Sequence, residues 1–222
     1  MKIESMHIEE NGVDVPGILL TPENSLGAIL IIHGYGGCKE EILGLSNRIA
    51  ETGFTVYTVD QRGHGENQYL LDNTIVNEIE MEIQFCRKFG KVVAIGHSSG
   101  GRLALTSSAD FKIGISPALA VEYGTKTREL LDNLRQYRVH EKYPGVNYDI
   151  LRYLPIWQSD YSNSSMIIYG SKDVPEIISQ CKILLEQGNN IFEIKNALHN
   201  DIYLLEDTFS IIIKQLRVWF NL

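Results

Sequence analysis

The sequence predicts an α/β protein with a mostly parallel central sheet of about eight strands and helices on both faces. Two observations carry this prediction. Short apolar runs rich in β-branched residues alternate with segments of roughly 10 to 16 residues that have helical periodicity. The composition is also that of a globular protein, with 44% hydrophobic and 22% charged residues among 222. We expect a single domain over residues 1–222.

The first elements along the chain form an antiparallel hairpin followed by a buried strand. Residues 6–9 and 15–21 flank Asn11-Gly12, a typical hairpin turn. Residues 28–32 are continuously apolar, as expected for a strand that is buried on both faces. The hairpin would add antiparallel strands at one edge of the sheet.

The alternation of strands and helices continues to the end of the chain. Helices are predicted where apolar residues recur every three or four positions, and strands where apolar runs are short and β-branched. The further strands are predicted at residues 54–59, 92–95, 112–115, 166–169 and 191–194. The helices are predicted at residues 39–52, 74–89, 98–109, 174–187 and 201–218. Such βαβ units produce parallel strands.

Residues 117–164 interrupt this alternation. They contain one predicted helix, at about 125–139, and a dense set of aromatic residues: Tyr123, Tyr137, Tyr143, Tyr148, Tyr153, Trp157 and Tyr161. Open α/β sheets bind ligands at the carboxyl ends of their strands. We therefore expect this segment to be a short helical lid over that edge.

The net charge and the cysteines indicate which binding partners and which cellular compartment to expect. The formal net charge is −8, so we expect no nucleic-acid partner, because nucleic acids bind basic surfaces. Cys38, Cys86 and Cys181 form neither a disulfide framework nor a metal motif, which favours a reducing, cytoplasmic location. No signal peptide or membrane span is recognisable, and neither a metal nor another cofactor is expected.

The central motif is Gly96-His97-Ser98-Ser99-Gly100, a G-x-S-x-G sequence between a predicted strand and a predicted helix. There the serine lies on a tight turn that exposes its hydroxyl as a nucleophile, and the glycines leave room for the turn. The motif predicts that Ser98 is the catalytic nucleophile. The alternative is an ordinary Gly-Ser loop.

A serine nucleophile also needs backbone amides that bind the oxyanion of the tetrahedral intermediate. One is predicted at Ser99, which follows the nucleophile. The other is predicted at Tyr35, in the glycine-rich loop 33–37 that follows the third strand. A flexible glycine turn is the alternative explanation of this loop.

The base and its orienting acid should follow in the order serine, acid, histidine. Of the six histidines, only His199 follows a late strand, and Asp173 follows the strand before it. His199 would take the Ser98 proton, and Asp173 would fix the tautomer of the imidazole. The alternatives are that Asp173 caps a helix and that His199 is an ordinary surface residue. If Asp173 is not the acid of the triad, Glu122 is the next candidate, the reserve acid.

With these motifs the chain resembles the α/β-hydrolase superfamily over nearly its whole length. Residues 60–65 are similar to the D-x-R-G-H-G loop of the serine-aminopeptidase-like, monoglyceride-lipase-like and small esterase branch, as are the H-G-x-G-G and G-H-S-x-G-G segments. The resemblance implies the α/β-hydrolase fold, a triad of Ser98, Asp173 and His199, and a structural role for the D-x-R-G-H-G loop. The residues before His199 lack the glycine that is common there.

The sequence therefore predicts a serine hydrolase that cleaves small carboxylic esters through an acyl-enzyme, with a small acyl compound as its partner. A thioesterase, an acyltransferase or a short-peptide hydrolase with the same triad is the alternative. A non-catalytic binding module on the same fold is a further one. Residues 126–142 have five basic and three acidic side chains, which suits either an acidic leaving group or a solvated helix face.

Overall fold

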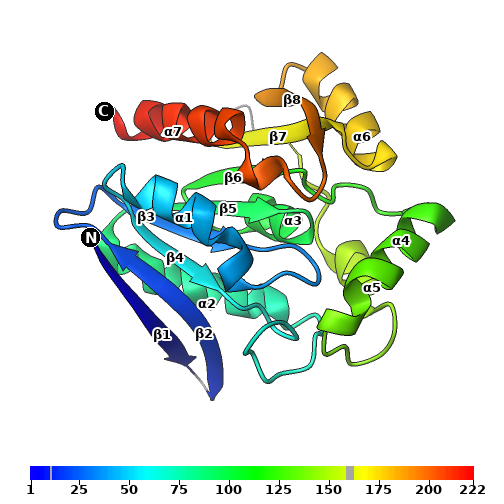
Figure 1. Ribbon diagram of the computed structural model, residues 1–222, viewed down its shortest axis with the longest axis horizontal. Helices are drawn as coiled ribbons and strands as arrows, with labels where there is room; N and C mark the ends of the chain where they lie inside the picture. The colour runs from blue at the N-terminus through cyan, green and yellow to red at the C-terminus, as the bar shows by residue number, and fades with distance from the viewer. Residues whose placement is uncertain (11, 159–162) are drawn as a thin grey trace.

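The computed structural model describes residues 1–10, 12–158 and 163–222. The strands are β1 (Lys2–Glu10), β2 (Val13–Thr21), β3 (Ala28–Ile32), β4 (Thr55–Val59), β5 (Val92–His97), β6 (Phe111–Ile115), β7 (Ser165–Lys172) and β8 (Ile191–Leu198). They form one sheet in the order β1-β2-β4-β3-β5-β6-β7-β8 (Figure 1). β1 pairs antiparallel with β2, and β2 with β4, whereas all the later pairs are parallel. The predicted eight-stranded, mostly parallel sheet is confirmed.

Helices cover both faces of this sheet (Figure 1). They are α1 (Leu43–Ala50), α2 (Ile75–Cys86), α3 (Ser99–Thr106), α4 (Thr125–Arg135), α5 (Val146–Tyr153), α6 (Pro175–Glu186) and α7 (Glu206–Phe220). Short 3-10 turns are η1 (Lys39–Ile42), η2 (Arg87–Phe89), η3 (Gln136–Arg138) and η4 (Ile202–Leu204).

The side chains of β3 show how the two apolar layers arise. Ala28, Leu30 and Ile32 belong to the layer with α2, α3 and α5, whereas Ile29 and Ile31 belong to the layer with α1 and α7. Successive side chains of a strand point to opposite faces. The continuous apolar run of β3 therefore serves both layers at once.

Several boundaries differ from those predicted. α3 ends at Thr106 instead of residue 109, since the Thr106 and Ser107 hydroxyls bond back to carbonyls of the last turn and Ser107 is extended. β8 continues to Leu198, four residues further than predicted, so that His199 follows it directly. α7 begins only at Glu206, after η4. The predicted turn residue Asn11 lies outside the described residues, as does Tyr161 of the aromatic set.

The segment between β6 and β7, residues 117–164, lies beside the carboxyl ends of the parallel strands (Figure 1). The predicted helix at 125–139 appears as α4 and η3. α5 was not predicted, although its Val146, Ile150 and Leu151 are buried against the core at helical spacing. Within the described residues, no helix is both long and apolar enough to cross a membrane.

Candidate active site

Ser98 occupies the sharp turn between β5 and α3. Its backbone has φ 54°, which is rare for a residue other than glycine, and its carbonyl accepts the amide of Arg102 in the first turn of α3. Gly96 and Gly100 allow this turn. A Cβ on Gly96 would overlap the carbonyl of Gly100, and a Cβ on Gly100 would overlap the backbone of β3 and His33. The expected strand–turn–helix geometry is therefore present.

The structure brings the three residues of the predicted triad together. His199 Nε2 lies 3.0 Å from Ser98 Oγ, and His199 Nδ1 lies 2.7 Å from Asp173 Oδ1. They come from three separate sheet ends: the β5–α3 turn, the loop between β7 and α6, and the residue after β8. In this arrangement Nδ1–H donates to Asp173 and Nε2 accepts the serine hydroxyl proton.

Asp173 is held ionised by the donors around it. Its carboxylate accepts hydrogen bonds from the Ser116 hydroxyl, the Val174 amide at 2.7 Å and His199. Burial by itself would raise the pKa of Asp173, but the hydrogen bonds from His199 and Ser116 bring it below its usual value. Ser116 was missed in the sequence, where its only signal is a polar residue directly after a buried strand.

His97 holds the backbone of His199 in place. Its Nε2–H donates to the carbonyl of His199 at 2.8 Å, and the two rings lie 4.8 Å apart between centroids. Burial lowers the pKa of His97 to about 3, so the ring is neutral at physiological pH. A neutral ring still donates from Nε2, which fixes the backbone that carries His199.

The glycine-rich loop with Tyr35 passes directly beside Ser98. A Cβ on Gly34 would lie 3.0 Å from Ser98 Cβ, which is a tight contact. The loop backbone therefore leaves little room for a side chain between itself and Ser98. Tyr35 and Ser99, the predicted oxyanion donors, both line a cavity with Ser98 and His199.

The beginning of this loop is joined to the D-x-R-G-H-G loop through His33. The amide of Gln61 donates to His33 Nε2 at 3.2 Å, and the side chain of Gln61 donates to the His33 carbonyl at 2.8 Å. Burial lowers the pKa of His33 to about 4, which keeps Nε2 free to accept. The D-x-R-G-H-G loop therefore holds one end of the loop that carries Tyr35.

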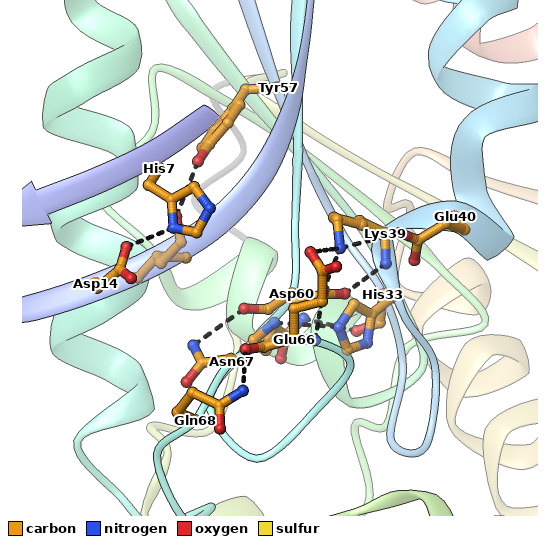
Figure 2. A network of polar contacts seen from close by, with 12 residues as sticks. His7, Asp14, His33, Lys39, Glu40, Tyr57, Asp60, Glu66, Asn67 and Gln68 are labelled. Carbon is orange, nitrogen blue, oxygen red and sulfur yellow. Dashed lines mark hydrogen bonds and ion pairs between the residues drawn. The ribbon is translucent and has the colours of Figure 1, made fainter. Parts of the chain in front are cut away.

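The other end of the loop is joined to the same region through Lys39. Lys39 Nζ lies 2.6 Å from Asp60 Oδ2 and 2.8 Å from Glu66 Oε2, and its amide donates to Asp60 Oδ1 at 2.8 Å (Figure 2). Both side chains of the Lys39–Asp60 pair are buried. Burial alone would lower the pKa of Lys39, but the hydrogen bonds to Asp60 and Glu66 raise it, so the ammonium stays charged.

Two small cavities of about 30 Å³ each flank Ser98. The first, which we call the apolar cavity, lies under the β6–β7 segment and is lined by residues that include Ala118, Tyr123, Leu131, Tyr148, Leu151 and Ile177. The second, which we call the polar cavity, is lined by residues that include Glu41, His97, Arg135, Asn200 and Tyr203. Tyr35, Ser98, Leu131 and His199 line both.

The other candidates lie away from this centre. Glu122, the reserve acid, is exposed and pairs with Arg128 at 3.0 Å and Arg152 at 3.2 Å. Burial raises the pKa of the Cys38 thiol, so it is not an activated nucleophile. Arg62 pairs with Glu78 at 2.7 Å. Across the described residues, no group of three His, Cys, Asp or Glu side chains is placed to hold a metal ion.

The sheet, the turn after β5 and the position of the site define the class of protein. The chain has the α/β-hydrolase fold. Its residues 27–121 match the family model described as alpha/beta hydrolase fold, which confirms the resemblance seen in the sequence motifs.

Individual relatives are distant. The chain is 30% identical over 84 residues to the sn-1-specific diacylglycerol lipase ABHD11 of Danio rerio, a match that covers 36% of this chain but only 26% of that relative. It is structurally similar to a hyperthermophilic esterase of Pyrobaculum calidifontis, with TM-score 0.68 and 18% identity over 98% of this chain and 85% of the other. A soluble variant of the monoglyceride lipase of Saccharomyces cerevisiae matches with TM-score 0.67 and 16% identity over 98% and 94%. At such identities these structures share the fold.

Proposed function

We propose that the protein is a serine hydrolase that cleaves small carboxylic esters through an acyl-enzyme. The hydrogen-bonded series Ser98, His199 and Asp173 carries this proposal. His199 Nε2 takes the hydroxyl proton as Ser98 Oγ attacks the carbonyl carbon of the ester. Asp173, ionised and bonded to Nδ1–H, stabilises the imidazolium that forms.

The tetrahedral intermediate carries a negative charge on the former carbonyl oxygen. We assign the backbone N–H groups of Tyr35 and Ser99 to this oxyanion, because both residues face the nucleophile across the same cavity. His199 then gives its proton to the leaving oxygen, the alcohol departs, and the acyl group remains on Ser98. Water that His199 deprotonates attacks the acyl-enzyme and releases the carboxylic acid.

The size of the apolar cavity supports a small acyl group. A cavity of about 30 Å³ holds about two water molecules by the usual requirement of roughly 10 to 15 Å³ each. Tyr148 and Leu151 of α5 and Leu131 of α4 line it. A short acyl chain fits with little movement, whereas a long chain requires α4 and α5 to move apart.

We further propose that residues 117–164 act as a short lid within one domain. α4 has no fully buried residue, so it is held less firmly than the helices that cover the sheet. All three cysteines are free thiols, which supports the reducing, cytoplasmic location expected from the sequence.

The test compares hydrolysis of p-nitrophenyl acetate and butyrate by the wild-type protein and by Ser98→Ala. We expect Ser98→Ala to lose at least about 10³-fold in kcat while its fold is retained. Ser179→Ala, an exposed serine on α6, is the matched control and should keep full activity. Undiminished activity of Ser98→Ala, or no covalent labelling of the folded wild type by a fluorophosphonate probe, would refute the proposal.

A second candidate is a hydrolase of acylglycerols. The names of two relatives, a diacylglycerol lipase and a monoglyceride lipase, favour it. A panel of nitrophenyl esters, monoacylglycerols and acyl-CoA thioesters of increasing chain length separates the candidates. Highest kcat/KM on acetyl or butyryl nitrophenyl esters supports the small-ester proposal, and highest kcat/KM on long acylglycerols supports the second candidate.

A further inference from the structure

The polar cavity beside Ser98 has a cation at its edge. Arg135, the last residue of α4, lines this cavity together with His199, and its side chain is 21% exposed. Of the five basic residues between positions 126 and 142, it alone lines either cavity that contains Ser98. Arg135 is therefore the one basic residue of this stretch that lies beside Ser98.

Arg135 packs against the glycine-rich loop 33–37, which carries Tyr35. Its Nη1 is 3.5 Å from the Gly36 carbonyl, which is a long hydrogen bond. Gly36 has φ 69°, and a Cβ there would lie 2.6 Å from Arg135 Cβ. The arginine backbone thus packs directly on the loop that carries Tyr35, with its side chain at the cavity.

The carboxylate of the same cavity, Glu41, forms ion pairs with two guanidinium groups and can balance the charge of only one. Glu41 Oε1 is 2.6 Å from Arg138 Nη1, whereas Glu41 Oε2 is 3.6 Å from Arg135 Nη1. Two guanidinium groups share one carboxylate, and the closer contact belongs to Arg138. Arg135 is left with no hydrogen bond to a carboxylate among the described residues.

The other nearby carboxylates are engaged elsewhere. Glu141 accepts hydrogen bonds from Tyr35 and from Gln136, and Asp132 accepts one from Tyr148. Asp173 lies behind His199 and is fully buried among its donors. None of the three lines the polar cavity.

The two buried histidines of this cavity add no charge of their own. His33 and His97 are neutral because burial lowers their pKa to about 4 and about 3. Burial chiefly lowers the pKa of His97 and raises that of Tyr203, and the positive charge of Arg135 adds to the first shift and opposes the second, so its field reaches both of these side chains. His199, which must protonate the leaving oxygen, lines both cavities, and the polar cavity is the one of the two that also holds Arg135.

We propose that the polar cavity is the leaving-group subsite and that Arg135 binds an anionic group, a carboxylate or a phosphate, on the alcohol part of the substrate. This inference rests on the proposed esterase function and specifies its substrate class. A guanidinium suits such a group because its N–H donors match the geometry of two anionic oxygens. Neutral esters remain substrates because the triad and the apolar cavity do not depend on this contact.

The test compares 4-acetoxybenzoate with its neutral methyl ester at pH 7.5. We expect the wild type to have the higher kcat/KM on the anionic ester, through a lower KM, and the preference to fall with added salt. Arg135→Gln should lower the ratio of the two kcat/KM values about tenfold, because any effect on the loop that carries Tyr35 is common to both esters and only the anionic ester loses the contact with the guanidinium. Arg135→Lys should give an intermediate ratio, because it keeps the charge and loses the fork of donors.

Lys126→Gln is the matched control, since it removes the same charge from an exposed position on the same helix. Equal loss on both esters in Arg135→Gln, or the same change of ratio in Lys126→Gln, would overturn the inference. Hydrolysis of phenyl hemisuccinate, which has its carboxylate on the acyl part, tests which part of the substrate Arg135 binds. If Arg135→Gln lowers kcat/KM more on this ester than on 4-acetoxybenzoate, the anion belongs on the acyl part and the assignment is overturned. If the wild type hydrolyses neither ester, the proposed function itself has failed.

Discussion

Tyr35 Oη donates a hydrogen bond of 2.6 Å to Glu141 Oε1, which joins the glycine-rich loop 33–37 to the β6–β7 segment. Glu141 is itself fixed in place. Gln136 donates to its other oxygen at 3.0 Å, and the neighbouring amide of His140 donates to the Gly63 carbonyl at 2.8 Å. Tyr35 is thereby tied at its hydroxyl to a residue 106 positions later in the chain.

We expect the loss of this bond to slow turnover more than it weakens substrate binding. Glu141→Ala and Tyr35→Phe should each lower kcat about 3- to 10-fold with little change in KM, because the bond positions the proposed oxyanion donor. Steady-state kinetics on p-nitrophenyl acetate measures this split. Tyr137→Phe, at a side chain that is 82% exposed on the same segment, is the control and should leave kcat unchanged. A rise in KM at constant kcat would contradict the positioning role.

The buried pair of Lys39 and Asp60 should be costly to break from one side. We expect Lys39→Met to destabilise the fold by about 3 to 5 kcal/mol, because it leaves the Asp60 carboxylate buried without its cation. Urea unfolding measures the difference. The double variant Lys39→Met with Asp60→Asn should recover part of the loss, since it removes both charges. Additive losses would show that the two residues act independently.

The turn at Ser98 should tolerate no side chain at Gly96. We expect Gly96→Ala to destabilise the fold by more than about 3 kcal/mol, because the new methyl group overlaps the Gly100 backbone. Gly44→Ala on α1 is the matched control: nothing lies within 4 Å of a Cβ there, so alanine should stabilise the helix by about 0.5 to 1 kcal/mol. Thermal unfolding of both variants is the measurement, and equal Tm values for Gly96→Ala and wild type would contradict the account.

Acid should destabilise the protein through its buried histidines. His33, His64 and His97 have pKa values lowered from 6.5 to about 4, 3 and 3, chiefly by burial. Below pH 6.5 the unfolded chain binds protons that the folded chain excludes, so stability falls as pH decreases toward 4. We expect the free energy of unfolding to fall by up to about 1 kcal/mol per histidine per pH unit. Urea unfolding between pH 7.5 and 5 measures this fall. His64→Gln should flatten this dependence, and an unchanged slope would argue against the buried neutral state.

The fold was predictable because its strands and helices differ in periodicity. β3 is continuously apolar, as is β5 from Val92 to Ile95, and each is followed by a helix with apolar residues every three or four positions. α5 escaped prediction because it has only eight residues and lies between Tyr143-Pro144-Gly145 and Pro155, which indicate loops. Its helical state depends on packing against the core, which a local pattern does not contain.

The candidate site was predictable where chain order constrains it. Ser98 and His199 follow from the turn motif and the order of the late strands. Asn196, three residues before His199, adopts φ 64°, a conformation that asparagine tolerates better than most residues. Ser116, Lys39 and Glu141 could not be found, because each acts on a residue that is distant in the chain and no local motif marks that contact.

The loop that carries Tyr35 is held by two parts of the chain, one in the buried core and one in the β6–β7 segment outside it. Lys39 and Asp60 hold it from inside the core, whereas Glu141 and Arg135 hold it from the β6–β7 segment. A replacement of that segment would alter the walls of the two cavities beside Ser98 and the support of the loop that carries Tyr35 in one step. In this chain, a change of substrate range that comes through the segment should therefore carry a change of catalytic rate with it.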